Sequence, residues 1–392
     1  VVVVDPGVDV DGTGGSRSIA DQVVKEIVDG GGSAVACTES VANIEPAFKS
    51  RAPQLTFEED GEWWVCDGKR LQTGFGFSGS QTGMRFETPG NMTAGDLFEN
   101  VRPGGYIPEE QIKDMDLDGI DVSIIYPSLG LQLFRVPENE LLNAVFRTYN
   151  DWVADFCKAS PKRLAGIAMI NVDLIDEAVQ ELERCKMMGM IGVMIPVYPL
   201  EGHRYNSPEY EPLWEAANRL EMPISLHAAT NRVGSGEGEP DGGRRISLVI
   251  NSSHYALMSI TDLIFAGVFE RYPKLQVGSV EHEIAWAAHM IERMDWNYKQ
   301  REAAQGSYRF QEDMLPGDYF RKNVFIGFQE DGLGIRLRDY IGLETLQWGS
   351  DYPHQESTFP RSRQILEEIL SDCTEREKTM IAGGNAARVY KL

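Results

Sequence analysis

The stretch Leu346-Gln-Trp-Gly-Ser-Asp351-Tyr-Pro-His354 ends a short apolar run at an aspartate. This pattern is typical of a barrel of parallel strands, in which active sites are built from side chains at the carboxyl ends of the strands. The alternative is that Asp351 only caps the next helix. Because the string Gly-Ser-Asp-Tyr-Pro-His is more specific than an ordinary helix cap, we interpret Asp351 as a functional residue.

The rest of the chain from about residue 115 alternates strand-like apolar runs with amphipathic helical patterns, which predicts βα repeats around a parallel sheet. The expected strands are 122–126, 165–170, 192–195, 223–227, 275–280, 324–328 and 346–350. The expected helices are 138–160, 176–188, 210–219, 259–271, 284–293 and 362–371. With one further strand from the N-terminal region, these elements predict a distorted α/β barrel of the (β/α)8 (TIM) class.

Composition narrows the possible partners and the compartment. The 392 residues are 42% hydrophobic, which suits one large core, and the longest apolar runs are far short of the roughly 20 residues that a membrane helix needs. The net charge of −23 repels nucleic acid and anionic membranes, so we expect neither as a partner. The five scattered cysteines lack a Cys-x-x-Cys pair and indicate reduced thiols in a cytoplasmic protein.

Two segments fall outside the repeat pattern. Residues 1–43 contain a strand at Val1–Val4, a glycine-rich turn, a helix and a second strand at Ser33–Cys37, which together predict a βαβ unit. Residues 54–105, rich in glycine, threonine and acidic residues, predict an insertion of short strands and loops that covers one end of the barrel.

The N-terminal unit resembles a fragment of a short-chain dehydrogenase, the βα unit just after the nucleotide-binding turn. The glycine motif and the Tyr-x-x-x-Lys pair of those enzymes are both missing. The nearest phosphate loop is Asp11-Gly-Thr-Gly-Gly-Ser16, and a glycine cluster without the full spacing more simply forms a flexible turn. We interpret residues 1–43 as a fused remnant with a packing role.

Residues 44–392 resemble the amidohydrolase-related family of metal-dependent barrels that contains aminocarboxymuconate-semialdehyde decarboxylase and the aromatic-acid decarboxylases. The motifs that carry the resemblance occur in order along the chain: Lys49-Ser-Arg-Ala-Pro53, Met115-Asp-Leu-Asp-Gly-Ile-Asp121, Pro223-Ile-Ser-Leu-His227, Val280-Glu-His-Glu-Ile-Ala-Trp286, Trp348 to His354, and Gly384-Asn-Ala-Ala-Arg388. The resemblance implies a metal-dependent (β/α)8 barrel that catalyses decarboxylation or hydrolysis, commonly as a homodimer.

Two motifs carry the residues that the resemblance implies for a divalent metal, zinc or manganese. His227 matches the family's metal-binding histidine at a strand's carboxyl end, and its alternative is a core histidine bonded to a backbone carbonyl. Asp351 matches the aspartate that binds the metal or exchanges a proton with substrate. We expect one metal ion to contact both residues.

Three further residues are candidates for proton transfer. Glu281 falls where the decarboxylases carry a catalytic histidine, and His282 follows it directly. A salt bridge at the rim of the barrel is the alternative for this pair. His354, just past Asp351, either contacts substrate or holds the Asp351 loop by a hydrogen bond.

One departure from the family pattern puts the metal site in doubt. The family's first strand ordinarily ends in a His-x-His or Glu-x-His pair of ligands, whereas the first histidine here is His203. The replacement strand is either Ser33–Cys37, which offers Cys37 or Glu39 as a substitute metal ligand, or Val1–Val4, which ends at Asp5.

Two functions follow from these observations. The first is a metal-dependent decarboxylase or hydrolase acting on a small aromatic or enoic carboxylic acid. The second is a catalytically impaired barrel that serves as a noncatalytic binding or scaffold protein, because the first ligand pair is missing. The retained His227, Asp351 and His354 favour the enzyme.

We expect residues 1–43 to bind no dinucleotide, because they lack the glycine turn that holds a pyrophosphate at a helix N-terminus. Calorimetric titration with NAD(H) and NADP(H) tests this. Micromolar affinity for either would show that Gly12–Ser16 forms an anion-binding nest of backbone amides.

Overall fold

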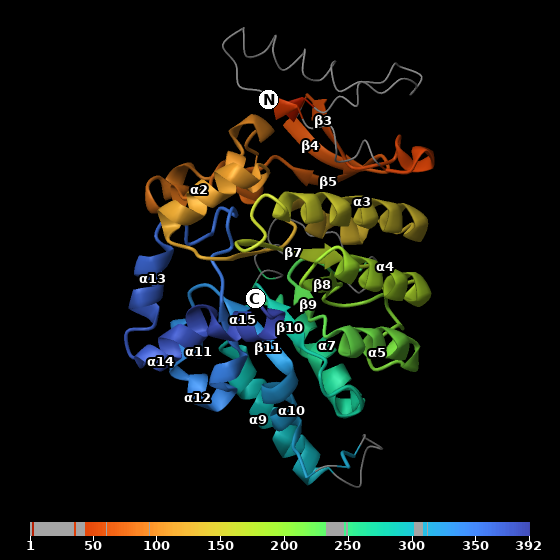
Figure 1. The fold of residues 1–392 in the computed structure, drawn as a ribbon, viewed down its shortest axis with the longest axis vertical. Helices are drawn as coiled ribbons and strands as arrows, with labels where there is room; N and C mark the ends of the chain where they lie inside the picture. Colours follow the sequence, from red (N-terminus) through yellow and green to blue (C-terminus); the bar gives the residue numbers. More distant parts are fainter. Residues whose placement is uncertain are drawn as a thin grey trace.

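The computed structural model describes residues 2–3, 35–36, 44–59, 61–93, 95–232, 247, 250–301, 309–311 and 313–392. Seven parallel strands form one sheet in which spatial order follows chain order. Their bounds are β6 (Ser123–Ile125), β7 (Leu164–Met169), β8 (Gly192–Ile195), β9 (Ile224–His227), β10 (Val277–Val280), β11 (Val324–Phe328) and β12 (Leu346–Trp348). Each corresponds to an expected strand, and Figure 1 shows helices packed around the curled sheet. The fold is a distorted (β/α)8 TIM barrel.

Helix α2 precedes the first of these strands, and the other helices occupy the connections between the strands and the C-terminal segment. Their bounds are α2 (Pro108–Asp118), α3 (Asn139–Cys157), α4 (Ile175–Met187), α5 (Glu211–Leu220), α7 (Ser253–Phe265), α8 (Val268–Arg271), α9 (Trp286–Gln300), α10 (Pro316–Asn323), α11 (Gly332–Arg336), α12 (Arg338–Ile341), α13 (Ser362–Ile369), α14 (Glu375–Thr379) and α15 (Asn385–Tyr390). The single helix expected over 259–271 was wrong. Gly267 adopts φ +69° there, a left-handed conformation that ends α7 and begins α8. No described helix combines the length and apolar character that crossing a membrane requires.

The expected eighth strand was also wrong for the described residues. β1 (Val2–Val3) and β2 (Val35–Ala36) pair with each other in parallel and form a separate sheet. Neither is paired with β6 or β12, the strands at the two edges of the barrel sheet. Among the described strands, β6 and β12 are therefore the two edges of the seven-stranded sheet.

The insertion begins with an antiparallel sheet of β3 (Gln54–Glu58), β4 (Gly61–Cys66) and β5 (Lys69–Thr73). Residues 74–107 then form short helical turns that reach the carboxyl end of β12. The Thr82 hydroxyl donates to the Pro353 carbonyl at 2.5 Å, and Arg85 Nε donates to the Ser357 carbonyl at 2.9 Å. This part of the insertion covers the end of the barrel that carries Asp351.

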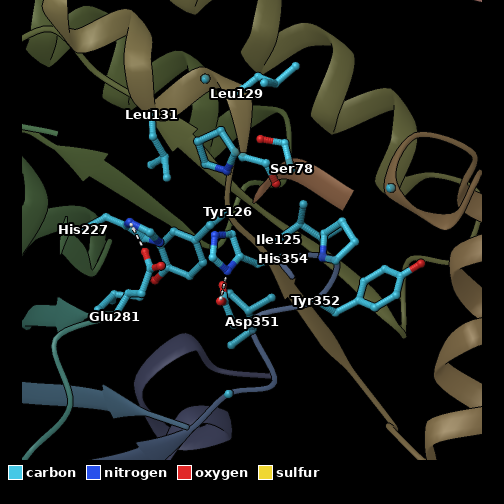
Figure 2. Close-up of a pocket in the computed structure, with 18 of the residues that line it drawn as sticks. Ser78, Ile125, Tyr126, Leu129, Leu131, His227, Glu281, Asp351, Tyr352 and His354 are labelled. Carbon is cyan, nitrogen blue, oxygen red and sulfur yellow. Dashed lines mark ion pairs between the residues drawn. The ribbon is translucent and has the colours of Figure 1, made fainter. Parts of the chain in front are cut away.

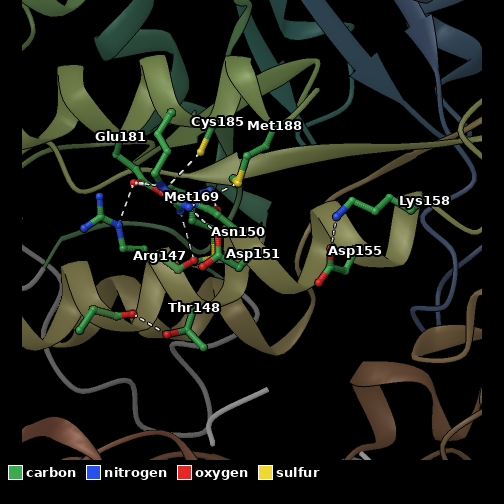
Figure 3. A network of polar contacts seen from close by, with 12 residues as sticks. Arg147, Thr148, Asn150, Asp151, Asp155, Lys158, Met169, Glu181, Cys185 and Met188 are labelled. Carbon is green, nitrogen blue, oxygen red and sulfur yellow. Dashed lines mark hydrogen bonds and ion pairs between the residues drawn. The ribbon is translucent and has the colours of Figure 1, made fainter. Parts of the chain in front are cut away.

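A buried polar network fixes the first helix of the barrel to its strand (Figure 3). The Asn150 amide on α3 donates to the Met169 carbonyl at 3.0 Å and accepts from the Met169 amide at 2.8 Å. The same side chain donates to Glu181 on α4 at 2.8 Å. Because Asn150 is fully buried, these bonds satisfy groups that would otherwise be costly to remove from water.

Large side chains fill the barrel interior beneath the site. Phe325 of β11 packs against Tyr390 of α15 with ring centroids 5.6 Å apart, and both side chains are buried. The neighbouring position on β10 is Gly278, where an added Cβ would lie 1.9 Å from the Phe325 ring. The Phe325 ring therefore requires glycine at position 278.

We expect Gly278→Ala to destabilise the protein by about 1–3 kcal/mol or more, because the added methyl group overpacks the barrel interior. Urea unfolding measures the change. Gly90→Ala is the matched control, since its Cβ would meet nothing within 4 Å, and we expect it to change stability by less than about 0.5 kcal/mol. Equal stability of the two variants would contradict the packing described.

Candidate active site

Three of the predicted site residues lie at the carboxyl ends of strands of the barrel sheet, two of them on the adjacent strands β9 and β10. His227 is the last residue of β9, Glu281 follows β10 directly, and Asp351 comes three residues after β12. With His354 they line one cavity of about 2410 Å³. The cavity exceeds the roughly 300–1,000 Å³ of ordinary ligand pockets because it continues into the seam between the edge strands β6 and β12.

The backbone at two of these positions is left-handed. Glu281 has φ +63° and Asp351 has φ +57°, which only a few per cent of residues other than glycine adopt. Such conformations cost on the order of 1 kcal/mol and are concentrated at functional sites. Surrounding contacts must therefore hold these two residues in place.

Polar contacts link the four residues in two pairs, which face one another in Figure 2. His227 Nδ1 lies 3.3 Å from Glu281 Oε2, and His354 Nδ1 lies 3.2 Å from Asp351 Oδ2. His227 Nδ1 also lies 3.0 Å from the Ala228 carbonyl, which can only accept. His227 thus donates from Nδ1, and in the neutral ring Nε2 keeps the free electron pair.

Burial and neighbouring charges shift the pKa values of three of these four residues. Burial, followed by repulsion from Asp351, raises the pKa of Glu281 to about 8. Burial lowers the pKa of His354, but the hydrogen bond to Asp351 and the nearby negative charges outweigh it, so that this pKa rises to about 9. Burial lowers the pKa of His227, which favours its neutral form. Near neutral pH Glu281 is therefore mostly protonated and His354 is positively charged, and a cation bound at these donor atoms would favour the ionised carboxylate of Glu281.

The donor atoms fit a divalent metal ion. Glu281, Asp351 and His354 each offer one ligand atom, and the three atoms lie within 4.8 Å of one another. Two carboxylate oxygens and one imidazole nitrogen suit both zinc and manganese. His227 lies outside that group of three but contacts Glu281.

His282 stands apart from this group. Its Nδ1 is hydrogen-bonded to the Ser279 hydroxyl at 2.9 Å, and burial lowers its pKa to about 3, which makes the ring neutral at pH 7. Its Nε2 is buried without a hydrogen-bond partner in the described part of the chain, although the residue lines the cavity.

Tyr126 is a site residue that the sequence analysis did not select. Its ring lies 5.3 Å from that of His227, and its hydroxyl is hydrogen-bonded to Ser225 at 2.7 Å and to Tyr390 at 2.9 Å. Its place as the last residue of the expected strand 122–126 was the available signal. Cys37, Glu39 and Asp5, the substitute ligands considered from the sequence, lie outside the described residues.

Sequence comparison identifies the family. Residues 97–392, more than half of the chain, match the amidohydrolase family. The chain belongs to the amidohydrolase family. One relative, 2-amino-3-carboxymuconate-6-semialdehyde decarboxylase from Dictyostelium discoideum, is 23% identical over 307 residues, with 77% of this chain and 81% of the relative covered. The predicted family resemblance is confirmed, and such relatives indicate that this amidohydrolase is an enzyme.

Solved structures show the same fold. An amidohydrolase from Mycobacterium avium subsp. paratuberculosis K-10 has a TM-score of 0.72 at 20% identity, covering 89% of this chain and 93% of that one. The 5-carboxyvanillate decarboxylase from Novosphingobium aromaticivorans DSM 12444, solved with manganese and 4-hydroxy-3-methoxy-5-nitrobenzoic acid, has a TM-score of 0.61 at 21% identity. It covers 72% of this chain and 79% of its own.

The pKa shifts predict that the metal-free protein loses stability as the pH rises from about 6.5 to about 8. Folded Glu281 keeps its proton up to about pH 8, whereas an unfolded glutamate ionises near about pH 4.3. The raised pKa of His354 also lowers stability as the pH rises through this window. The lowered pKa of His282 has the opposite effect on stability, but only below about pH 6.5. Each extra proton bound in the folded state lowers the free energy of unfolding by at most about 1.4 kcal/mol for each unit by which the pH rises.

Urea unfolding of chelator-treated protein at several pH values measures this slope. Since the Glu281 side chain is 30% exposed, solvent screening makes the stated slope an upper limit. We expect Glu281→Gln to remove much of the slope, and Glu87→Gln, at an exposed position of the insertion, to leave it unchanged. Stability that rises with pH in this window would contradict the charge distribution described.

Proposed function

We propose that this amidohydrolase is a divalent metal-dependent decarboxylase of a small aromatic carboxylic acid. The observation that carries the proposal is the convergence of His227, Glu281, Asp351 and His354 at the carboxyl end of the barrel. The relative from Dictyostelium discoideum and the manganese-containing 5-carboxyvanillate decarboxylase support the reaction type, because both are named as decarboxylases of carboxylated substrates.

In this proposal Asp351 and His354, two of the three residues whose donor atoms lie within 4.8 Å of one another, would hold the metal together with the free Nε2 of His227. The third of them, Glu281, is left for proton transfer. A bound divalent ion supplies a Lewis-acid charge that neutralises the substrate carboxylate and an adjacent oxygen. Leu129 and Leu131, together with the Tyr126 ring beside His227, offer an apolar wall for an aromatic ring (Figure 2).

Glu281 is the residue to which we assign proton transfer. When the bond between the ring carbon and the carboxyl carbon breaks, carbon dioxide leaves and the electron pair stays on the ring carbon, which must take up a proton. Glu281 lies between His227 and the Asp351–His354 pair at the cavity wall, so its carboxylic acid can reach the same substrate. His282 fits this role less well, because its ring is hydrogen-bonded to Ser279 and is neutral at pH 7, so it lacks the acidic proton of an imidazolium.

The missing first-strand pair supports a second candidate, a noncatalytic binding or scaffold protein. The described residues supply no histidine before His203. Metal content separates the two candidates: protein purified without chelator carries about one equivalent of zinc or manganese if the site is complete, and none if the barrel only binds or scaffolds.

A cytoplasmic location and a homodimeric state are part of the same proposal. The described cysteines Cys66, Cys157, Cys185 and Cys373 are all free, as expected in a reducing compartment. Trp296 on α9 is 43% exposed and offers an apolar contact for a second subunit. Sedimentation equilibrium tests the dimer.

We expect Asp351→Asn to weaken manganese binding by at least tenfold, because it removes a charged ligand, and to abolish turnover. Glu281→Gln should keep most of the metal affinity yet reduce decarboxylation by about 10²-fold or more, because the proton donor is lost. Calorimetric manganese titration and carbon dioxide release from a panel of hydroxybenzoates measure the two effects. His289→Asn, on α9, is the control and should change neither.

Loss of manganese binding in Glu281→Gln would instead make Glu281 a metal ligand. Full decarboxylation by Glu281→Gln would exclude it as the proton donor. A wild-type protein that binds no metal and releases no carbon dioxide would favour the noncatalytic candidate.

A further inference from the structure

The loop that carries Asp351 and His354 is held from outside the barrel by residues that the proposed chemistry does not use. This loop, residues 349–361, connects β12 to α13. It lies against α2 and the 74–107 part of the insertion. Since Asp351 has a left-handed backbone conformation, the loop needs external contacts to keep its carboxylate at the site.

The first contact holds the residue next to Asp351. The Tyr352 hydroxyl donates to Asp114 Oδ2 at 2.5 Å, and Asp114 on α2 is only 8% exposed. Arg102 completes this unit by donating from Nε to Oδ2 at 2.7 Å and from Nη2 to Oδ1 at 2.5 Å. A bidentate arginine fixes both the position and the orientation of the carboxylate that accepts the hydrogen bond from the tyrosine hydroxyl.

The second contact holds the far end of the loop. Asp118 Oδ1 accepts from the Ser362 amide at 2.9 Å, and its Oδ2 accepts from the Ser362 hydroxyl at 2.5 Å. Ser362 is the first residue of α13 and is fully buried. Asp114 and Asp118 are four residues apart, so they lie on one face of α2 and bind both ends of the loop.

The backbone of the insertion is shaped for this contact. An added Cβ at Gly104 would lie 2.1 Å from the Tyr352 hydroxyl and 2.5 Å from Asp114 Oδ2. Thr82 adds a hydrogen bond to the Pro353 carbonyl at 2.5 Å. Glycine at position 104 is thus what allows the tyrosine to reach Asp114.

We infer that Asp114 and Tyr352 are positioning residues, which hold Asp351 and His354 in the geometry that the site needs. The consequence for metal affinity rests on the proposed function. The restraint on the loop itself is a property of the metal-free protein. Residues 51–121 therefore contribute to the site through the loop, although none of the four central residues comes from them.

Hydrogen exchange of the metal-free full-length protein tests the inference. We expect Tyr352→Phe to speed exchange of the loop amides of His354 and Thr358 by about tenfold, because one buried hydrogen bond to a carboxylate is lost. Exchange in strand β9 should not change. Tyr272→Phe is the matched control, since it removes a similar tyrosine hydrogen bond, to Glu211 at 2.8 Å, away from the loop.

Gly104→Ala is a second test, because it displaces the tyrosine without removing a polar group. We expect the same local increase in exchange, and manganese affinity reduced by about tenfold in both variants. Unchanged loop exchange in both variants, or an equal increase throughout β6–β12, would overturn the inference. If the wild-type protein binds no manganese, the proposed function fails, while the exchange data still decide whether Asp114 and Tyr352 restrain the loop.

Discussion

The parallel direction of strands β6 to β12 is the constraint on which the site depends. In a parallel sheet all carboxyl ends lie at the same edge, and curling brings the ends of separate strands toward one cavity. His227, Glu281 and Asp351 come from three different βα repeats and are close only for this reason. Phe325 and Tyr390, which pack against each other, line this cavity from the barrel interior.

Placing these groups together has an electrostatic cost. Partial burial and the charge of Asp351 raise the pKa of Glu281, because its ionised form would be repelled, and only His354 among the four central residues offers a positive charge near neutral pH. The left-handed conformations of Glu281 and Asp351 add backbone strain. A cation at the donor atoms would relieve the repulsion, and contacts from α2 and the insertion oppose the strain at Asp351.

Helix α2 and the insertion therefore do more than cover the barrel. Asp114 and Asp118 each bind one end of the loop that carries Asp351 and His354, across more than 200 residues of sequence. The seam between β6 and β12 has no comparable support, because no described strand pairs with both edges to close it. One side of the site is thus restrained from outside, while the other continues into a large cavity.

The sequence by itself determined the seven strands, most of the helices and the family, and it selected the candidate site residues His227, Glu281, Asp351 and His354, because strand ends and short motifs are local signals. It located the two N-terminal strands but wrongly assigned one of them to the barrel, and it missed Tyr126, since strand pairing and ring contacts join distant residues. The hydrogen bond from Tyr352 to Asp114 and the raised pKa of Glu281 were likewise decided only by the tertiary structure. Both depend on which groups share a buried space, and that is set by the packing of the whole chain.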